Sequence, residues 1–82
     1  MKYFLPNINS KIRKVMSATF KIAAKKISNN ASPDTISSWD SITHLTLVAA
    51  LEKQFKIKFT DDESVEILNF ISIRKTIISK FK

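Results

Sequence analysis

The stretch from Trp39 to Phe55, WDSITHLTLVAALEKQF, decides the fold because it joins a helix-start signal to an apolar stripe. Asp40 can accept a hydrogen bond from a backbone N–H group of the first helical turn. Apolar residues then recur at every fourth position: Leu47, Leu51 and Phe55. Residues at this spacing share one helix face. The stretch therefore predicts a helix from Ser41 to Phe55 with one buried face.

The segment before this helix predicts a first helix and a long loop. Apolar or small residues recur at steps of three and four and predict a helix from near Ser10 to Phe20 or somewhat beyond: Ile12, Val15, Met16, Thr19, Phe20 and Ala23. Asn9 or Ser10 can cap its start. Residues 28–35 are polar, contain Pro33 and predict a loop. The chain has no glycine, so we expect asparagine to occupy left-handed backbone positions.

Two more helices follow. Thr60 and Glu63 have the spacing of a capping box and predict a short third helix to about Leu68. Asn69 can cap a last helix. The apolar residues of that helix form a stripe, with Ile71 and Ile78 alongside: Phe70, Ile73, Ile77 and Phe81. The fold class predicted is all-α, a four-helix bundle with a long first loop and a short third helix.

Length and composition limit the possible functions. The 82 residues suffice for one domain, residues 1–82, in which we expect residues 1–8 to be flexible. The absence of cysteine excludes disulfides and thiolate metal sites, and a single histidine cannot build a metal cluster. No apolar run approaches the roughly 20 residues of a membrane span. We expect a monomeric, cytoplasmic protein.

The net charge of +7 would ordinarily suggest nucleic acid or an anionic membrane surface as partner. However, no lysine or arginine lies between Ile27 and Glu52, whereas Asp34 and Asp40 do. No nucleic-acid-binding motif is recognisable. The segment around Ser41 is therefore locally acidic inside a basic protein.

Ser41 is the candidate site for chemistry. Its hydroxyl is expected at a helix N-terminus, where unpaired N–H groups and the helix dipole favour a phosphate. His44 lies one turn further on, but no orienting carboxylate accompanies it, so we expect it to pack against Trp39. Asp61, Asp62 and Glu63 are expected to stabilise a first helical turn and not to bind a metal.

A second apolar stripe on the same helix consists of Ile42, Leu45 and Ala49. Exposed apolar groups beside a reactive serine would suit a docking surface. The alternative is that these residues simply widen the core stripe.

From about Ile12 to Lys80 the chain resembles an acyl carrier protein. The triplet Asp40-Ser41-Ile42 opens a helix, an acid-rich short helix follows, and a last helix begins after Asn69. Trp39 before Asp40-Ser41 resembles a subgroup of stand-alone carriers found beside polysaccharide-modifying or specialised biosynthetic enzymes.

The resemblance implies that Ser41 carries 4′-phosphopantetheine, attached by a phosphopantetheinyl transferase that uses coenzyme A. The thiol of the arm would hold an acyl or aminoacyl thioester, which implies loading and accepting enzymes as partners and no enzymatic activity of the chain's own. Asp40 would help to position the transferase. The docking residues expected on the helix are Ile42, Thr43, Leu45, Thr46 and Ala49.

The chain departs from the family in its charge. Relatives present several carboxylates on the second helix, where this chain has Thr43 and Thr46, and Lys56 replaces a glycine often found after the phenylalanine. Two alternatives therefore stay open: an unmodified carrier-like interaction module, or a small basic domain that binds nucleic acid or anionic lipid.

Overall fold

The computed structural model describes residues 7–81, which form four α-helices and one short 3₁₀-helix. In chain order these are α1 (Ile8–Phe20), η1 (Ala24–Lys26), α2 (Ser41–Phe55), α3 (Asp61–Glu66) and α4 (Phe70–Ser79). No strand is present among these described residues. The predicted all-α fold, with its long first connection and short third helix, is confirmed.

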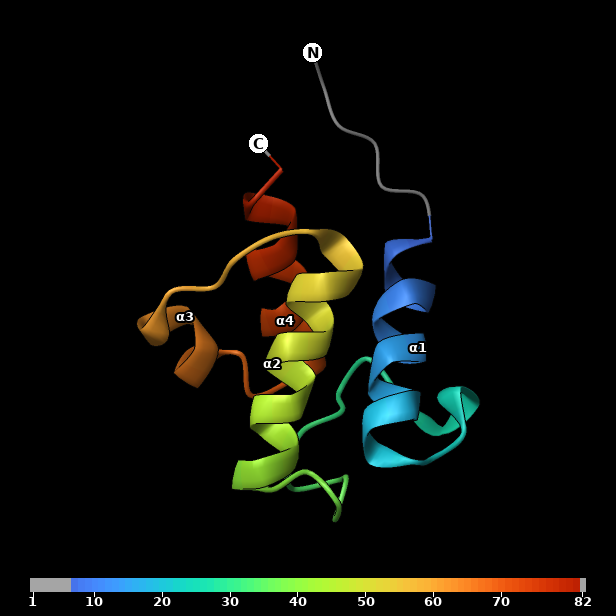
Figure 1. The fold of residues 1–82 in the computed structure, drawn as a ribbon. Coiled ribbons are helices and arrows are strands. Elements are labelled where there is room, and N and C mark those ends of the chain that lie inside the picture. Colours follow the sequence, from blue (N-terminus) through green and yellow to red (C-terminus); the bar gives the residue numbers. More distant parts are fainter. Residues whose placement is uncertain (1–6, 82) are drawn as a thin grey trace.

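The helices pack with α1 beside α2 in roughly opposite directions, while α4 lies behind α2 and α3 stands apart to one side (Figure 1). The first residues of α2 lie at one end of the bundle, next to the loop that leads from η1. α3 lies on the side of α2 away from α1 (Figure 1), and its Ser64 contacts His44 in the first turns of α2.

The core is built from the predicted stripes. Leu47, Leu51 and Phe55 are buried on α2, and Phe70, Ile73 and Ile77 are buried on α4. The buried residues of α1 are Ile8, Ile12, Met16 and Phe20, but Ala23 lies beyond the helix and is exposed. Ile71 is also exposed because it lies on the outer side of α4.

Helix starts follow the predicted caps at three of four places. Asp40, Thr60 and Asn69 each accept a backbone N–H of the following first turn. The predicted start of the first helix was wrong, because α1 begins at Ile8 after Asn7, which makes no side-chain cap. Ile8 is buried, whereas the flexibility expected for residues 1–6 lies outside the described residues.

Left-handed backbone occurs at Asn7, as expected for an asparagine, but also at two lysines, Lys21 and Lys56. Lys21 and Lys56 end α1 and α2, where the chain must leave the helix axis sharply. A residue with a Cβ atom pays a steric cost in this conformation. The ends of α1 and α2 therefore carry local strain that a glycine would remove.

The loop between η1 and α2 is ordered by hydrogen bonds to the helices. Arg13 of α1 donates from Nε to the Ile27 carbonyl oxygen at 2.8 Å, and its guanidinium lies over the Phe70 ring. The Phe70 N–H donates to the carbonyl oxygen of the buried Ala31 at 3.0 Å. These contacts connect α1 and α4 to the loop and so fix the segment that leads to Ser41.

Candidate functional site

Ser41 is the first residue of α2, and its side chain is exposed. Within residues 7–81 no group hydrogen-bonds to its hydroxyl. The sequence places it there because Asp40 ends the extended segment and caps the helix. An exposed hydroxyl without an intramolecular partner is available to an external reactant.

Asp40 shapes the surroundings of this hydroxyl. One oxygen, Oδ1, accepts the backbone N–H groups of Ile42 at 3.0 Å and Thr43 at 2.9 Å. The bond from the Thr43 N–H is the largest cause that lowers the pKa of Asp40 below its ordinary value. A hydrogen bond to the charged form favours ionisation.

This cap changes the expectation for a phosphate on Ser41. Two of the first-turn N–H groups are already used by Asp40, and only the Ser41 N–H remains without a partner among the described residues. The sequence predicted several free N–H groups around a phosphate on Ser41. Within residues 7–81 only the N–H of Ser41 itself is free for it.

Thr43 belongs to the same cap. Its Oγ1 accepts the Asp40 N–H at 2.8 Å and donates to the Ser38 carbonyl oxygen at 2.7 Å. The side chain is half-buried. Thr43 was predicted as a docking residue, but its hydroxyl is engaged in holding the turn before Ser41.

The predicted contact between His44 and Trp39 is confirmed. The Trp39 indole N–H donates to His44 Nδ1 at 3.0 Å, and the two rings are nearly parallel. His44 Nε2 lies 2.6 Å from the Ser64 carbonyl oxygen of α3. Both ring nitrogens are therefore occupied by structural partners, and His44 holds α3 against the start of α2.

A groove of about 480 Å³ opens beside Ser41. The residues that line it come from the loop, α2 and α3: Pro33, Trp39, Asp40, Ser41, His44, Leu45, Val65 and Leu68. Most of these side chains are apolar, so the groove can shelter an apolar group attached near Ser41.

The outer side of α2 is exposed and partly apolar. Ile42 and Leu45 are 75% and 69% exposed, and Thr46 and Ala49 are exposed as well. The alternative of a wide core stripe is wrong for these residues, because the core of α2 is confined to the face of Leu51. The exposed stripe has the geometry of a docking surface.

Val65 and Leu68 were not predicted as part of the site. They are 65% and 46% exposed, and both line the groove. No apolar period marks them in the sequence, because α3 spans only Asp61–Glu66 and is too short to show one. It also ends before Leu68, where the sequence predicted its end.

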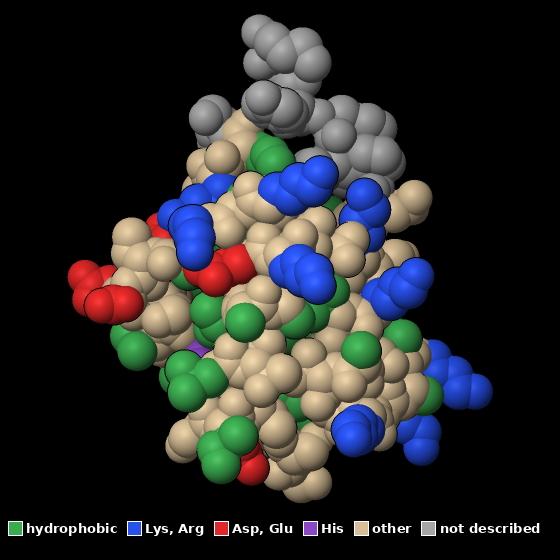
Figure 2. Space-filling view, in the orientation of Figure 1, with side chains coloured by type: hydrophobic (Ala, Val, Ile, Leu, Met, Phe, Trp, Pro, Cys, Tyr) green, Lys and Arg blue, Asp and Glu red, His purple; other side chains and the backbone are tan. Residues whose placement is uncertain are grey.

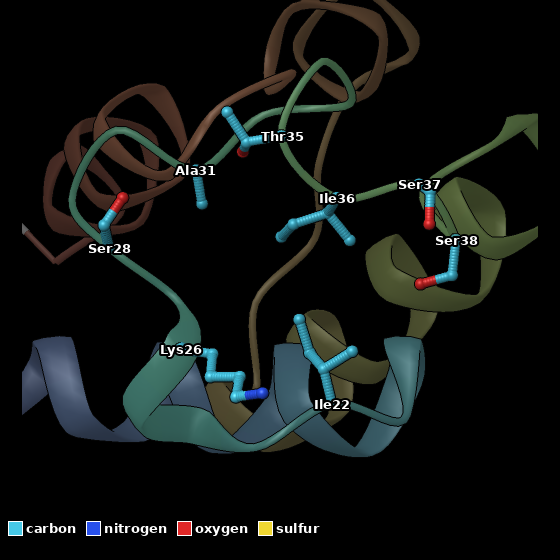
Figure 3. A pocket seen from close by; sticks show the side chains of 8 residues that line it. All are labelled: Ile22, Lys26, Ser28, Ala31, Thr35, Ile36, Ser37 and Ser38. Atoms are coloured by element: carbon cyan, nitrogen blue, oxygen red, sulfur yellow. The ribbon is translucent and has the colours of Figure 1, made fainter.

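A second hollow, of about 320 Å³, lies between η1 and the loop (Figure 3). Several hydroxyl groups and the Lys26 ammonium border it. Two of these hydroxyls already order the loop: Ser28 Oγ accepts the Asn30 N–H, and Ser38 Oγ donates to the Phe20 carbonyl oxygen. This hollow therefore belongs to the ordering of the loop.

The described residues contain no cluster that could hold a metal ion. Glu63 instead completes the capping box of α3 with Thr60 and pairs with Lys80. Over the same residues, every helix is too short or too polar to cross a membrane.

Comparison with known proteins places the chain in a family. No established family profile matches it. It is 37% identical over 71 residues to an acyl carrier protein of Buchnera aphidicola subsp. Schizaphis graminum (strain Sg), which covers 87% of this chain and 86% of the relative. An acyl carrier protein of Buchnera aphidicola subsp. Acyrthosiphon pisum (strain Tuc7) is 33% identical over 63 residues, 77% of this chain and 79% of the relative. The all-helical fold agrees with these relatives, and the chain belongs to the acyl carrier protein family.

Proposed function

We propose that the protein holds an acyl or aminoacyl group as a thioester on a 4′-phosphopantetheine arm attached to Ser41. The observation that carries this proposal is the exposed, unpartnered Ser41 hydroxyl at the edge of an apolar groove. Family membership supports a carrier role. The proposal requires no catalytic residue of the chain's own.

The residues around Ser41 fit such an arm. Ser41 Oγ would attack the pantetheine-side phosphorus of coenzyme A. The pyrophosphate bond would break, adenosine 3′,5′-bisphosphate would leave, and Ser41 would carry a phosphodiester at the exposed first turn of α2, where no core residue is displaced. The arm supplies a thiol, which the cysteine-free chain lacks. The groove lined by Leu45, Val65 and Leu68 would cover part of an apolar cargo.

The partners proposed are a phosphopantetheinyl transferase and the enzymes that load and accept the cargo. Ile42, Leu45, Thr46 and Ala49 form the exposed side of α2 next to Ser41, so these residues would contact the partners. Asp40 would hold Ser41 in position through the cap. Cytoplasmic location and a monomeric state are part of this proposal.

The test is modification in solution. The protein is incubated with coenzyme A and a broad-specificity phosphopantetheinyl transferase, and intact masses are measured. We expect the wild type to gain one phosphopantetheine and Ser41→Ala to gain none, while Ser37→Ala, which changes an exposed loop serine, gains one. No gain in the wild type with several transferases would favour the unmodified interaction module.

A further inference from the structure

A second groove, of about 560 Å³, lies between α1 and α2, and Ser41 does not line it. Both helices contribute to its lining, which includes Val15, Ala18 and Thr19 of α1 and Thr46, Ala50 and Lys53 of α2. Of these residues, only Thr46 also belongs to the docking side of α2 next to Ser41. We call this hollow the α1–α2 groove.

The floor of the α1–α2 groove is apolar and is made of small side chains. Val15 and Ala50 are half-buried, and Ala18 is exposed. Because none of them is large, no side chain of the floor covers the space between the two helices. Small residues on a helix surface let a further helix approach to the roughly 8–10 Å that separates the axes of packed helices.

Lysines border the groove on both helices. Lys53 of α2 lines it, and on α1 Lys14 lies one helical turn before Ala18, as Lys11 does before Val15. All three lysines are exposed and have no ion-pair partner within residues 7–81. In Figure 2 lysine and arginine side chains lie over α1 and over the neighbouring part of α2.

Acidic side chains do not balance these lysines. α1 contains no aspartate or glutamate, and the one acid within α2 is Glu52. Glu52 Oε2 accepts the Phe59 N–H at 2.9 Å, so this carboxylate is turned toward the segment that connects α2 with α3. The α1–α2 groove therefore combines an apolar floor with a positively charged border that the described residues leave unneutralised.

We propose that the α1–α2 groove binds an acidic amphipathic helix of a partner protein. The apolar stripe of that helix lies on Ala18 and Ala50, and its carboxylates lie beside Lys14 and Lys53. The groove follows α2 from Thr46 to Gln54, which is about 12 Å at 1.5 Å per residue and matches about two turns of a partner helix. The inference goes beyond the proposed function, because it does not depend on modification of Ser41.

The chemistry of the groove favours a helix over other anionic partners. Helices that lie on a membrane insert large apolar side chains into the lipid, whereas the apolar residues here are small and lie between two helices. Single-stranded nucleic acid stacks its bases on aromatic rings, and no aromatic residue is among the lining residues of this groove. An amphipathic helix supplies an apolar ridge and carboxylates together.

A designed peptide tests the proposal with the full chain. The probe is a labelled peptide of about 18 residues, long enough to form a helix, with leucine along one stripe and glutamate on both flanks. Fluorescence anisotropy at several sodium chloride concentrations measures its affinity, and chemical-shift changes of backbone amides locate its contact site. We expect binding that weakens with salt and the largest shift changes at Val15, Ala18 and Ala50. The same peptide with lysine in place of glutamate should not bind.

Matched variants separate the charged border from the apolar floor. Lys53→Glu should lower the affinity about five- to tenfold at low salt and flatten its salt dependence, whereas Lys75→Glu, on α4, should change it by less than about twofold. Ala18→Gln should fill the groove and lower the affinity without changing the salt dependence, whereas Ala23→Gln, beyond the end of α1, should have no effect. All four residues are exposed, so we expect the variants to fold.

Three outcomes would overturn the proposal. The first is no binding of the acidic peptide, or shift changes spread over every lysine-rich side of the protein. The second is binding of the wild type to vesicles of phosphatidylserine and phosphatidylcholine that is lost in Lys53→Glu and Ala18→Gln, which would assign the groove to anionic lipid. The third is self-association in sedimentation that is lost in the same variants, which would make a second copy the occupant. Modification of Ser41 is measured separately by mass, so none of these outcomes contradicts the proposed function.

Discussion

At the scale of single residues, two partners of opposite kind hold His44 in one neutral tautomer. The Trp39 indole N–H can only donate, so His44 Nδ1 must accept and carry no proton. The Ser64 carbonyl oxygen can only accept, so Nε2 must carry the proton and donate. The tautomer follows from these partners, and it leaves no ring nitrogen free to activate Ser41.

Replacing Trp39 by phenylalanine should therefore lower the free energy of unfolding by more than the smaller buried ring alone would. Trp39→Phe keeps an aromatic ring against Phe20 but leaves His44 Nδ1 without its donor, which should cost about 1–3 kcal/mol of the free energy of unfolding. Denaturant unfolding measures the cost.

The control is a double-mutant cycle with His44→Leu. Removing both partners should cost clearly less than the sum of the two single changes. Strict additivity would contradict a coupled hydrogen bond between Trp39 and His44.

At the scale of helices, the sequence predicted helix bounds most accurately where a capping residue and a long apolar stripe coincide. Ser41–Phe55 is observed with its predicted bounds, because Asp40 and the stripe through Leu51 give the same answer. The start of α1 was misplaced because Asn7 makes no side-chain cap, so that no local signal marks it. Val65 was missed because six residues of α3 show no period.

The sequence predicted that α2 ends at Phe55 but not that Lys56 adopts the left-handed conformation, at φ 56° and ψ 49°. Its N–H donates to the Glu52 carbonyl oxygen, so the helix end needs this conformation. Lys56→Gly should stabilise the protein by up to about 1 kcal/mol, because glycine avoids the steric cost of the Cβ atom, although it adds freedom to the unfolded chain.

Denaturant unfolding of Lys56→Gly, compared with Lys58→Gly, checks this expectation. Lys58 is exposed, and its φ is not positive, so glycine there should bring no gain and should lower stability slightly. Equal effects of the two changes would indicate loss of a lysine charge and not relief of backbone strain.

At the scale of the whole molecule, the net charge follows from the composition, but the distribution of the charged side chains over the surface does not. The sequence indicated that the segment around Ser41 is free of cations, and Figure 2 shows where the lysines and arginines gather instead. That α3 borders the Ser41 groove could not be read from spacing, because it depends on how the loop after α2 returns to the helix. His44 and Ser64, twenty residues apart, make that contact.

The excess of positive charge should make the folded protein more stable in moderate salt than in dilute buffer. The chain carries a net charge of +7, and within residues 7–81 the structure has one ion pair, Lys80–Glu63, so we expect repulsion to outweigh pairing. Sodium chloride at about 0.1 M screens charges beyond roughly 10 Å. Each 1 kcal/mol of repulsion relieved would raise the melting temperature by about 4–8 °C in a domain of this size.

Thermal unfolding of the wild type and of Lys11→Gln with Lys14→Gln, from about 10 to 300 mM sodium chloride, tests this argument about repulsion. Both lysines are exposed on α1 three residues apart, so their like charges are neighbours on the helix surface. The double variant should melt at a higher temperature than wild type in dilute buffer and gain less from added salt. A wild-type melting temperature that falls as sodium chloride rises would mean that attractive charge pairs outweigh repulsion in the folded protein.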